Sequence, residues 1–523
     1  MAMWDKDRLD FLDNNKTLFE TNVLATKNGA IVDSDNPLPV SIGGESVTIT
    51  GDVTIPGTIN VTSAADNPVH NHITQVGTGA ILTDDYLPVG GTVALDSASL
   101  AALETINIGT IPEVEIKNDT GNPLPVELPP TQLDSFGRLR VSNPLTLFNS
   151  SHRYAKNDLW FEDTTGTASS TFNAPEGLID MNIGTASGDE VLRETTKVFV
   201  YQPGKSLLVM NTFTFDTAKT NLRQRVGYFG SDNGIFLQQN DSTVSFVMRS
   251  YVTGSSVDTT INQSSWNGDK LDGTGASGLT LDLTKVQIQW MDLEWLGAGQ
   301  VRIGFIINGI FIICHTFYAA NVIGQTYMTT ASLPLRYEIT NTGTVATPSE
   351  LKQICSTVIS EGGAELSGRQ QAVGTPITAA RSTLAGGAFL PIASIRLKAA
   401  RLDSIVILTA LSILGDGSGN FNWQVRAAST TTGGTWISAG ANSSVDYNLT
   451  GTATTGGRTL ASGYFSATNQ SNLSVDILKE ALFKFQLERD SFTSTPIELT
   501  LMVAGSGSGD PIFGSLDWEE ITR

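Results

Sequence analysis

Two carboxylates spaced two residues apart form the most enzyme-like element of the sequence. Asp292 and Glu294 lie in the run Trp290-Met-Asp-Leu-Glu-Trp295, whose composition predicts a strand. Alternate residues of a strand share one face, so the two carboxyl groups would lie about 7 Å apart. That separation suits the acid–base pair of a glycosidase.

The same run resembles the Glu-x-Asp-x-x-Glu strand of concanavalin-like glycoside hydrolases. Trp290 stands where that family has its first, nucleophilic Glu, and Leu293-Glu294 breaks the spacing of the second. We therefore expect a solvent-facing acidic pair flanked by packing tryptophans. No catalytic residue is assigned, and the chain is predicted not to be an enzyme.

His70 and His72 are the candidate metal ligands. Period 2 places both imidazoles on one side of a strand, and three such pairs around a trimer axis would offer six nitrogens to one transition metal. The alternative is a pair of exposed histidines in the turn that follows Asn67-Pro68.

The remaining nucleophile candidates are Cys314-His315 and Cys355. Cys314 ends an apolar run, where a buried thiol is ordinary, and no Asn or Asp partner can be identified. The sequence has no phosphate-binding loop, zinc-ligand spacing or nucleophile elbow, so we expect no cofactor.

Composition narrows the class of protein further. The chain has 523 residues and a net charge of -20, which argues against nucleic-acid binding because phosphate contacts need clustered Lys and Arg. The charged start at Met1 has no apolar h-region after it, so we predict no signal peptide. The most apolar stretch, 301–315, carries Arg302 and is interrupted at Asn308-Gly309, so we predict no membrane insertion.

The N-terminal quarter differs from the rest of the chain. It holds 11 of the 19 prolines in its first 148 residues but only one of the eight tryptophans, so it cannot bury a core of its own. We predict a helical virion anchor over 1–30, with its helix over 5–19, and an extended, Pro/Thr-rich β shaft over 31–147. A short helix is expected over 96–104. The alternative to the shaft is a flexible linker.

The rest of the chain reads as two β-sandwich, jelly-roll-like domains, over 148–347 and 348–523. Strand-like runs separated by turn residues continue throughout, and a new run of strands begins at Leu351. Asn308-Gly309 between apolar runs predicts a two-residue type I′ hairpin. The fold class is therefore mainly β, with an extended N-terminal part.

Several pieces resemble the virion structural proteins of tailed bacteriophages, particularly those infecting cyanobacteria and other marine bacteria. These are the degenerate Asn-Pro-Leu-Pro-Val copies at 36–40 and 122–126, the junction over 134–148, the β unit over 290–315 and the run over 333–339. The resemblance covers roughly residues 30–345. It implies a structural protein of the virion, assembled in the host cytoplasm, and it carries no catalytic residues.

Together these observations predict a trimeric fibre or spike, attached to other virion proteins through its N-terminal region. Shared strands would bury the apolar residues of 31–147 and remove exposed strand edges. The sandwiches could present Trp266, Trp423 or Trp436 to host-surface glycans, or bury them in their cores. Two alternatives stay open: a capsid decoration, connector or baseplate protein with only virion partners, and a glycan-degrading tailspike.

Overall fold

The structure of the protein is a computed structural model. It describes residues 133–134, 139, 143–365, 367–416, 418–467 and 485–521, together with four two-residue strands nearer the N-terminus. The chain divides into two units, 1–127 and 128–523. The predicted helices over 5–19 and 96–104, and His70 and His72, lie outside the described residues.

The first unit is described only at its four short strands. Strand β1 (Thr26–Lys27) pairs with β2 (Ala30–Ile31), and β3 (Gly57–Thr58) pairs with β4 (Pro88–Val89), both antiparallel. Strand β4 begins at a proline, in a two-stranded sheet where that residue has no central ladder to interrupt.

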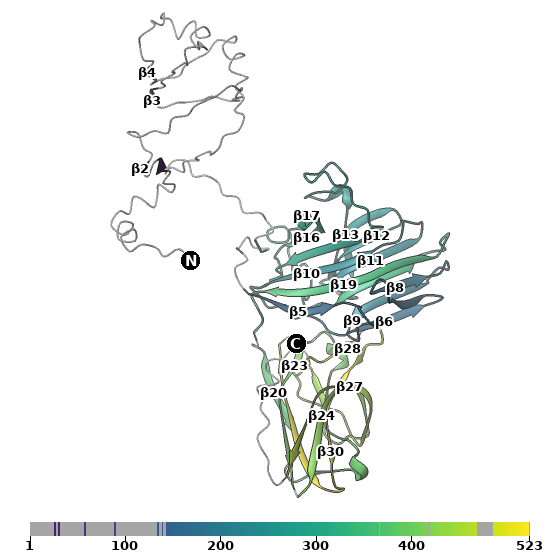
Figure 1. The fold of residues 1–523 in the computed structure, drawn as a ribbon, viewed down its shortest axis with the longest axis vertical. Helices are drawn as coiled ribbons and strands as arrows, with labels where there is room; N and C mark the ends of the chain where they lie inside the picture. Colours follow the sequence, from purple (N-terminus) through teal and green to yellow (C-terminus); the bar gives the residue numbers. More distant parts are fainter. Residues whose placement is uncertain are drawn as a thin grey trace, which may run out of the picture. The chain divides into compact units, whose positions relative to one another are not determined.

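The N-terminal half of the second unit is a sandwich of two antiparallel sheets (Figure 1). The first, which we call sheet G, has the order β17-β16-β15-β10-β19-β8-β7, with β5 also paired to β19. Its strands are β5 (Pro144–Ser150), β7 (Ser169–Asn173), β8 (Leu178–Ile183), β10 (Ser206–Thr214), β15 (Gln287–Leu293), β16 (Val301–Ile307), β17 (Ile310–Phe317) and β19 (Ser349–Glu361).

The facing sheet, which we call sheet H, has the order β14-β13-β12-β11-β18-β9-β6. Its strands are β6 (Trp160–Thr165), β9 (Glu190–Thr195), β11 (Leu222–Phe229), β12 (Gly234–Asn240), β13 (Thr243–Ser250), β14 (Val257–Asn262) and β18 (Leu335–Asn341). Alternate residues of both sheets, such as Val209, Met291 and Tyr337, are fully buried in one shared core.

The predicted hairpin at Asn308-Gly309 is confirmed. Ile307 pairs with Ile310, and both turn residues have positive φ, 53° and 77°, as a type I′ turn requires. The turn fixes the register of β16 and β17.

The predicted domain boundary at 347/348 differs from the structure. The run that begins at Leu351 is strand β19, which pairs with β10, β8 and β5 inside sheet G. The sequence predicts a strand here correctly, and side-chain burial alternates along it. The period of a strand, however, does not show which sheet the strand joins. The first sandwich therefore extends through Glu361, and it begins with β5 at Pro144 rather than at 148.

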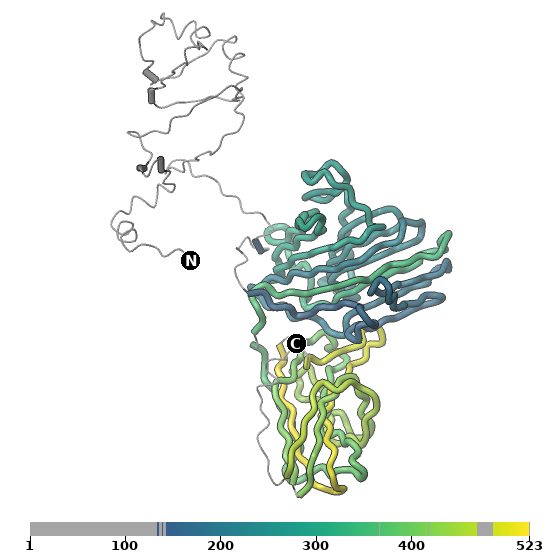
Figure 2. The backbone as a smooth tube through the Cα atoms, in the orientation of Figure 1, coloured from purple at the N-terminus to yellow at the C-terminus, as the bar shows by residue number. Residues whose placement is uncertain are grey.

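A second sandwich follows, coloured from green to yellow in Figure 2. Six strands form one sheet: β25 (Ile437–Ser438), β26 (Val445–Asn448), β22 (Leu390–Leu397), β30 (Glu498–Gly505), β24 (Asn420–Thr432) and β27 (Ala453–Ser466). The other sheet centres on β31 (Pro511–Glu520), paired with β20 (Arg369–Gly374), β21 (Arg381–Ser382) and β23 (Val406–Gly415). A separate core includes Trp518 and Leu501. The prediction of a mainly β protein with two sandwiches is confirmed.

A short hairpin, β28 (Arg489–Asp490) with β29 (Thr495–Pro496), lies where the two sandwiches meet. The backbone N–H of Arg489 donates to the Thr196 carbonyl at 2.9 Å, and Gln486 Nε2 donates to the Val198 carbonyl at 2.7 Å. Val198 and Val200 pack with Ile405 and Ile407 in a small apolar cluster. The sandwiches thus share both apolar and polar contacts.

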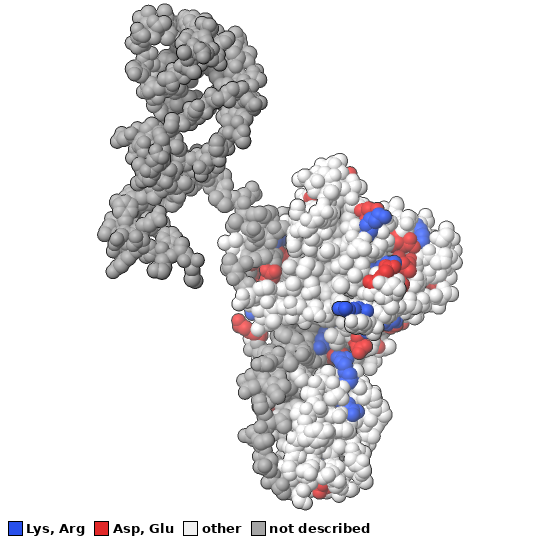
Figure 3. All heavy atoms as spheres, in the orientation of Figure 1, with Lys and Arg blue, Asp and Glu red and all other residues white. Residues whose placement is uncertain are grey.

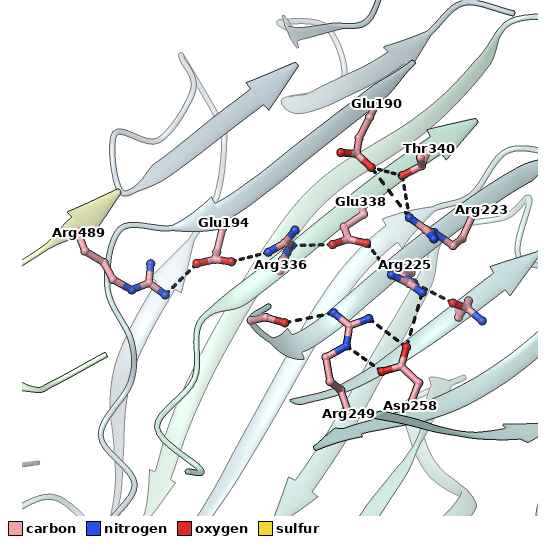
Figure 4. A network of polar contacts seen from close by, with 12 residues as sticks. Glu190, Glu194, Arg223, Arg225, Arg249, Asp258, Arg336, Glu338, Thr340 and Arg489 are labelled. Carbon is pink, nitrogen blue, oxygen red and sulfur yellow. Dashed lines mark hydrogen bonds and ion pairs between the residues drawn. The ribbon is translucent and has the colours of Figure 1, made fainter. Parts of the chain in front are cut away.

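The outer face of sheet H carries a chain of alternating charges that reaches this hairpin (Figure 4). Glu194 lies between Arg489 and Arg336, at 2.8 and 3.1 Å. The guanidinium of Arg336 lies 5.5 Å from the ring centre of Phe492, next to the same hairpin. The other members of the network are Glu190, Arg223, Arg225, Arg249, Asp258, Glu338 and Thr340.

Candidate functional site

A cleft of about 460 Å³ opens at the end of the first sandwich, beside Ile521, the residue that follows β31 of the second. Leu207 pairs with Leu293 and Ser206 pairs with Glu361, so the start of β10 lies beside the ends of β15 and β19. The segments that continue from these three strand ends supply Lys205, Trp295 and Glu365 to the cleft. Its volume suits a ligand of a few sugar rings.

Two aromatic residues form one wall of the cleft. Trp295 is half-buried, and its Nε1 donates to the Met328 carbonyl at 3.2 Å, which fixes the plane of the indole. The Tyr201 ring meets it edge-on, at 6.0 Å and 89°. The Tyr201 oxygen accepts a hydrogen bond from the Leu296 N–H at 3.1 Å, and burial raises the pKa of its hydroxyl. The result is a fixed aromatic platform.

Hydroxyl groups from the loop before β18 also line the cleft. Thr329 Oγ1 accepts from Asn233 Nδ2 at 2.7 Å, Thr330 Oγ1 accepts from the Ser332 N–H at 3.0 Å, and Ser332 Oγ accepts from the Tyr201 N–H at 3.3 Å. A hydroxyl that accepts one hydrogen bond can still donate its own proton. The cleft therefore combines an aromatic surface with oriented hydroxyl donors.

The carboxylates predicted to face solvent lie near the cleft but do not line it. Asp292 and Glu294 are both fully buried, so the prediction of a solvent-facing pair is wrong. Asp292 forms an ion pair with Arg302 of the neighbouring strand β16 and accepts a hydrogen bond from Ser206 Oγ at 2.9 Å. The pairing of β15 with β16 places Arg302 directly opposite Asp292, so the buried carboxylate has a cation beside it.

The cysteines and His315 do not form a nucleophilic site. Cys314 is fully buried in β17, and burial raises the pKa of its thiol. His315 Nδ1 accepts from the Asn267 N–H at 3.3 Å, and burial lowers the pKa of its imidazole. Cys355 lies in β19, which three strands of sheet G separate from β17. Among residues 143–521, with the gaps given above, no group of three His, Cys, Asp or Glu is arranged to hold a metal ion.

Two of the three tryptophans considered for glycan contact are core residues. Trp266 is buried and stacks on Phe246 at 4.2 Å, and Trp423 is buried in the second sandwich. Trp436 is partly exposed, but the Arg396 guanidinium lies 4.0 Å from its ring centre. Sequence reasoning interpreted Trp295 only as a packing residue. The signal that could have indicated a loop there is the Gly-rich turn Leu296-Gly-Ala-Gly299, which follows the strand directly.

Comparison with known proteins gives no family. No family model matches the chain, and no curated protein matches it. No helix in the described part is long and apolar enough to cross a membrane.

Several solved structures share a weak likeness. The receptor-binding domain of botulinum neurotoxin D matches with 9% identity and a TM-score of 0.27, and the match covers 42% of this chain and 50% of that chain. The Emp47p carbohydrate recognition domain matches with 9% identity, 42% and 97% coverage and a TM-score of 0.26. A β-1,3-glucanase from Mycobacterium marinum matches with 10% identity, 41% and 98% coverage and a TM-score of 0.28. The chain spans half the length of the neurotoxin structure, and scores this low decide nothing about function.

Proposed function

We propose that the chain is a non-enzymatic subunit of a phage fibre or spike, and that its cleft binds glycans of the host surface. The observation that carries the adhesive part is the cleft itself, whose lining includes both the aromatic residues Trp295 and Tyr201 and the hydroxyls of Thr330 and Ser332. A sugar ring has an apolar C–H face and a rim of hydroxyls, so it needs this combination of surfaces.

The virion part of the proposal is supported by the sequence. The Asn-Pro-Leu-Pro-Val copies and the junction over 134–148 carry the resemblance to phage structural proteins. Burial of Asp292 against Arg302 supports binding without hydrolysis, because a glycosidase needs two carboxyl groups that reach the scissile bond.

Glycan binding is tested with the full-length protein on an array of neutral and acidic bacterial surface glycans. We expect binding that falls at least about tenfold in Trp295→Ala, since that change removes the aromatic platform. Trp436→Ala is the matched control, because this partly exposed tryptophan lies outside the cleft. Failure of the native chain to bind any glycan, or equal binding by Trp295→Ala, would refute the adhesive function.

Oligomeric state is tested separately by light scattering coupled to size exclusion. A fibre or spike predicts a mass near three times the 55.6 kDa of the chain. A monomer would refute the trimer and favour a decoration or connector protein that meets a different virion partner.

A further inference from the structure

Among the residues that the structure describes, Lys205 and Glu365 are the two charged ones that line the cleft. We propose that the cleft is selective for acidic glycans, and that the carboxylate of a uronic acid or similar sugar displaces Glu365 from Lys205. This inference rests on the proposed glycan-binding function and names the class of sugar that the site takes.

The ion pair between these residues is built so that it can be exchanged. Lys205 Nζ lies 3.6 Å from Glu365 Oε1, beyond hydrogen-bonding distance. The Lys205 side chain is 19% exposed, whereas that of Glu365 is 80% exposed. The cation is therefore a fixed part of the wall, and its carboxylate partner extends into water, where such pairs contribute little.

The backbone at Glu365 is held in place independently of its carboxylate. Gln202 donates from Nε2 to the Glu365 carbonyl, and its Oε1 accepts from the Glu365 N–H at 2.9 Å. These two hydrogen bonds keep the segment against the cleft whichever way the side chain turns. A ligand carboxylate can then replace that of Glu365 by side-chain rotation alone, without opening the backbone.

The surroundings of Lys205 favour a carboxylate over a neutral group. Lys205 Nζ also donates to Gln202 Oε1 at 3.2 Å, which orients the ammonium group. Once Glu365 turns away, the ammonium is the remaining charge on the lining. A charge-assisted hydrogen bond is stronger than a neutral one, so an acidic sugar gains an interaction that its neutral counterpart lacks. Trp295 and the hydroxyls then contact the rest of the ring.

The test compares one acidic bacterial polysaccharide, chosen from the array, before and after reduction of its carboxyl groups to alcohols. We expect reduction to weaken binding to the native chain about fivefold to tenfold. Lys205→Met should bring the affinities for the acidic and the reduced form to within about twofold of each other, because it removes the charge-assisted hydrogen bond. Glu365→Gln should tighten binding of the acidic form about twofold to fivefold, because it removes the competitor. Binding of the acidic form should also weaken as salt rises.

The outcomes separate this inference from the proposed function. If neither form binds and no other glycan does, both proposals fail. If glycans bind and Trp295→Ala abolishes that binding, but reduction and Lys205→Met have no effect, only the acidic selectivity is overturned. Weaker binding of the acidic form by Glu365→Gln would also overturn it, since the carboxylate would then be a ligand contact rather than a competitor.

Discussion

Glu194 provides the sharpest test of what joins the two sandwiches. Its side chain is 1% exposed and lies between Arg489 of the β28–β29 hairpin and Arg336 of β18. Glu194→Ala leaves Arg489, itself buried, without this carboxylate, whereas Arg336 keeps Glu338 at 2.7 Å. Removing one partner of a buried ion pair typically costs about 3–5 kcal/mol, and we expect the lower end of that range because half of the network survives.

The assay is urea unfolding of the full-length protein followed by tryptophan fluorescence, in a double-mutant cycle with Arg489→Met. We expect the two changes to be non-additive by at least about 1 kcal/mol, because the double variant no longer buries an uncompensated charge. Glu176→Ala is the matched control: its pair with Lys352 has the same 2.8 Å separation but is exposed, so the cost should stay below about 1 kcal/mol. Additive effects, or equal losses in Glu194→Ala and the control, would refute the reasoning.

Three further predictions concern the first sandwich. Burial and the nearby Arg193 lower the pKa of His152 from 6.5 to about 4. The folded state therefore binds fewer protons than the unfolded state, and it loses stability as the pH falls from about 6.5 to about 4. Urea midpoints at pH 7 and 5 should show this loss in the native chain and less of it in His152→Gln. Gly309→Ala should lower the free energy of unfolding by about 1 kcal/mol, because φ at this residue is 77°. Gly324→Ala is the control and should be near neutral in the same assay, since φ there is not in the left-handed region and an added Cβ meets nothing within 4 Å. Asp292→Asn should lower the free energy of unfolding by about 2–3 kcal/mol through the loss of its ion pair with Arg302, yet leave glycan binding per folded molecule unchanged. A selective loss of glycan binding would show that this carboxyl acts at the site.

Local features of the fold were predictable from the sequence. The Asn308-Gly309 turn depends on two adjacent residues that tolerate positive φ, so its sequence is sufficient to predict it. The strands around Val209 and Val247 follow from short apolar runs and bounding turns, which are equally local.

Features that depend on distant segments could not be predicted in the same way. Strand β19 lies beside β10 although about 140 residues separate them, and its period-2 pattern would suit either sandwich equally. The pattern predicted that Asp292 faces solvent, because it could not show that Arg302 and Ser206 close over this carboxylate. His70 and His72 remain a prediction.

The cleft could not be predicted from the sequence, and the origin of its lining residues explains why. Its lining comes from segments far apart in the sequence: β10 pairs with β15 and β19, which brings Lys205, Trp295 and Glu365 together, and a hydrogen bond from the Tyr201 N–H joins Ser332 to them. Trp295 alone is consistent with core packing, and Lys205 alone with an ordinary surface charge. Only the shared strand end turns them into an aromatic platform beside a cation. Because β10 also packs into the common core, a one-residue shift in its register would turn core residues such as Val209 to the other face of the sheet, so the cleft and the sandwich core depend on the same strand pairing.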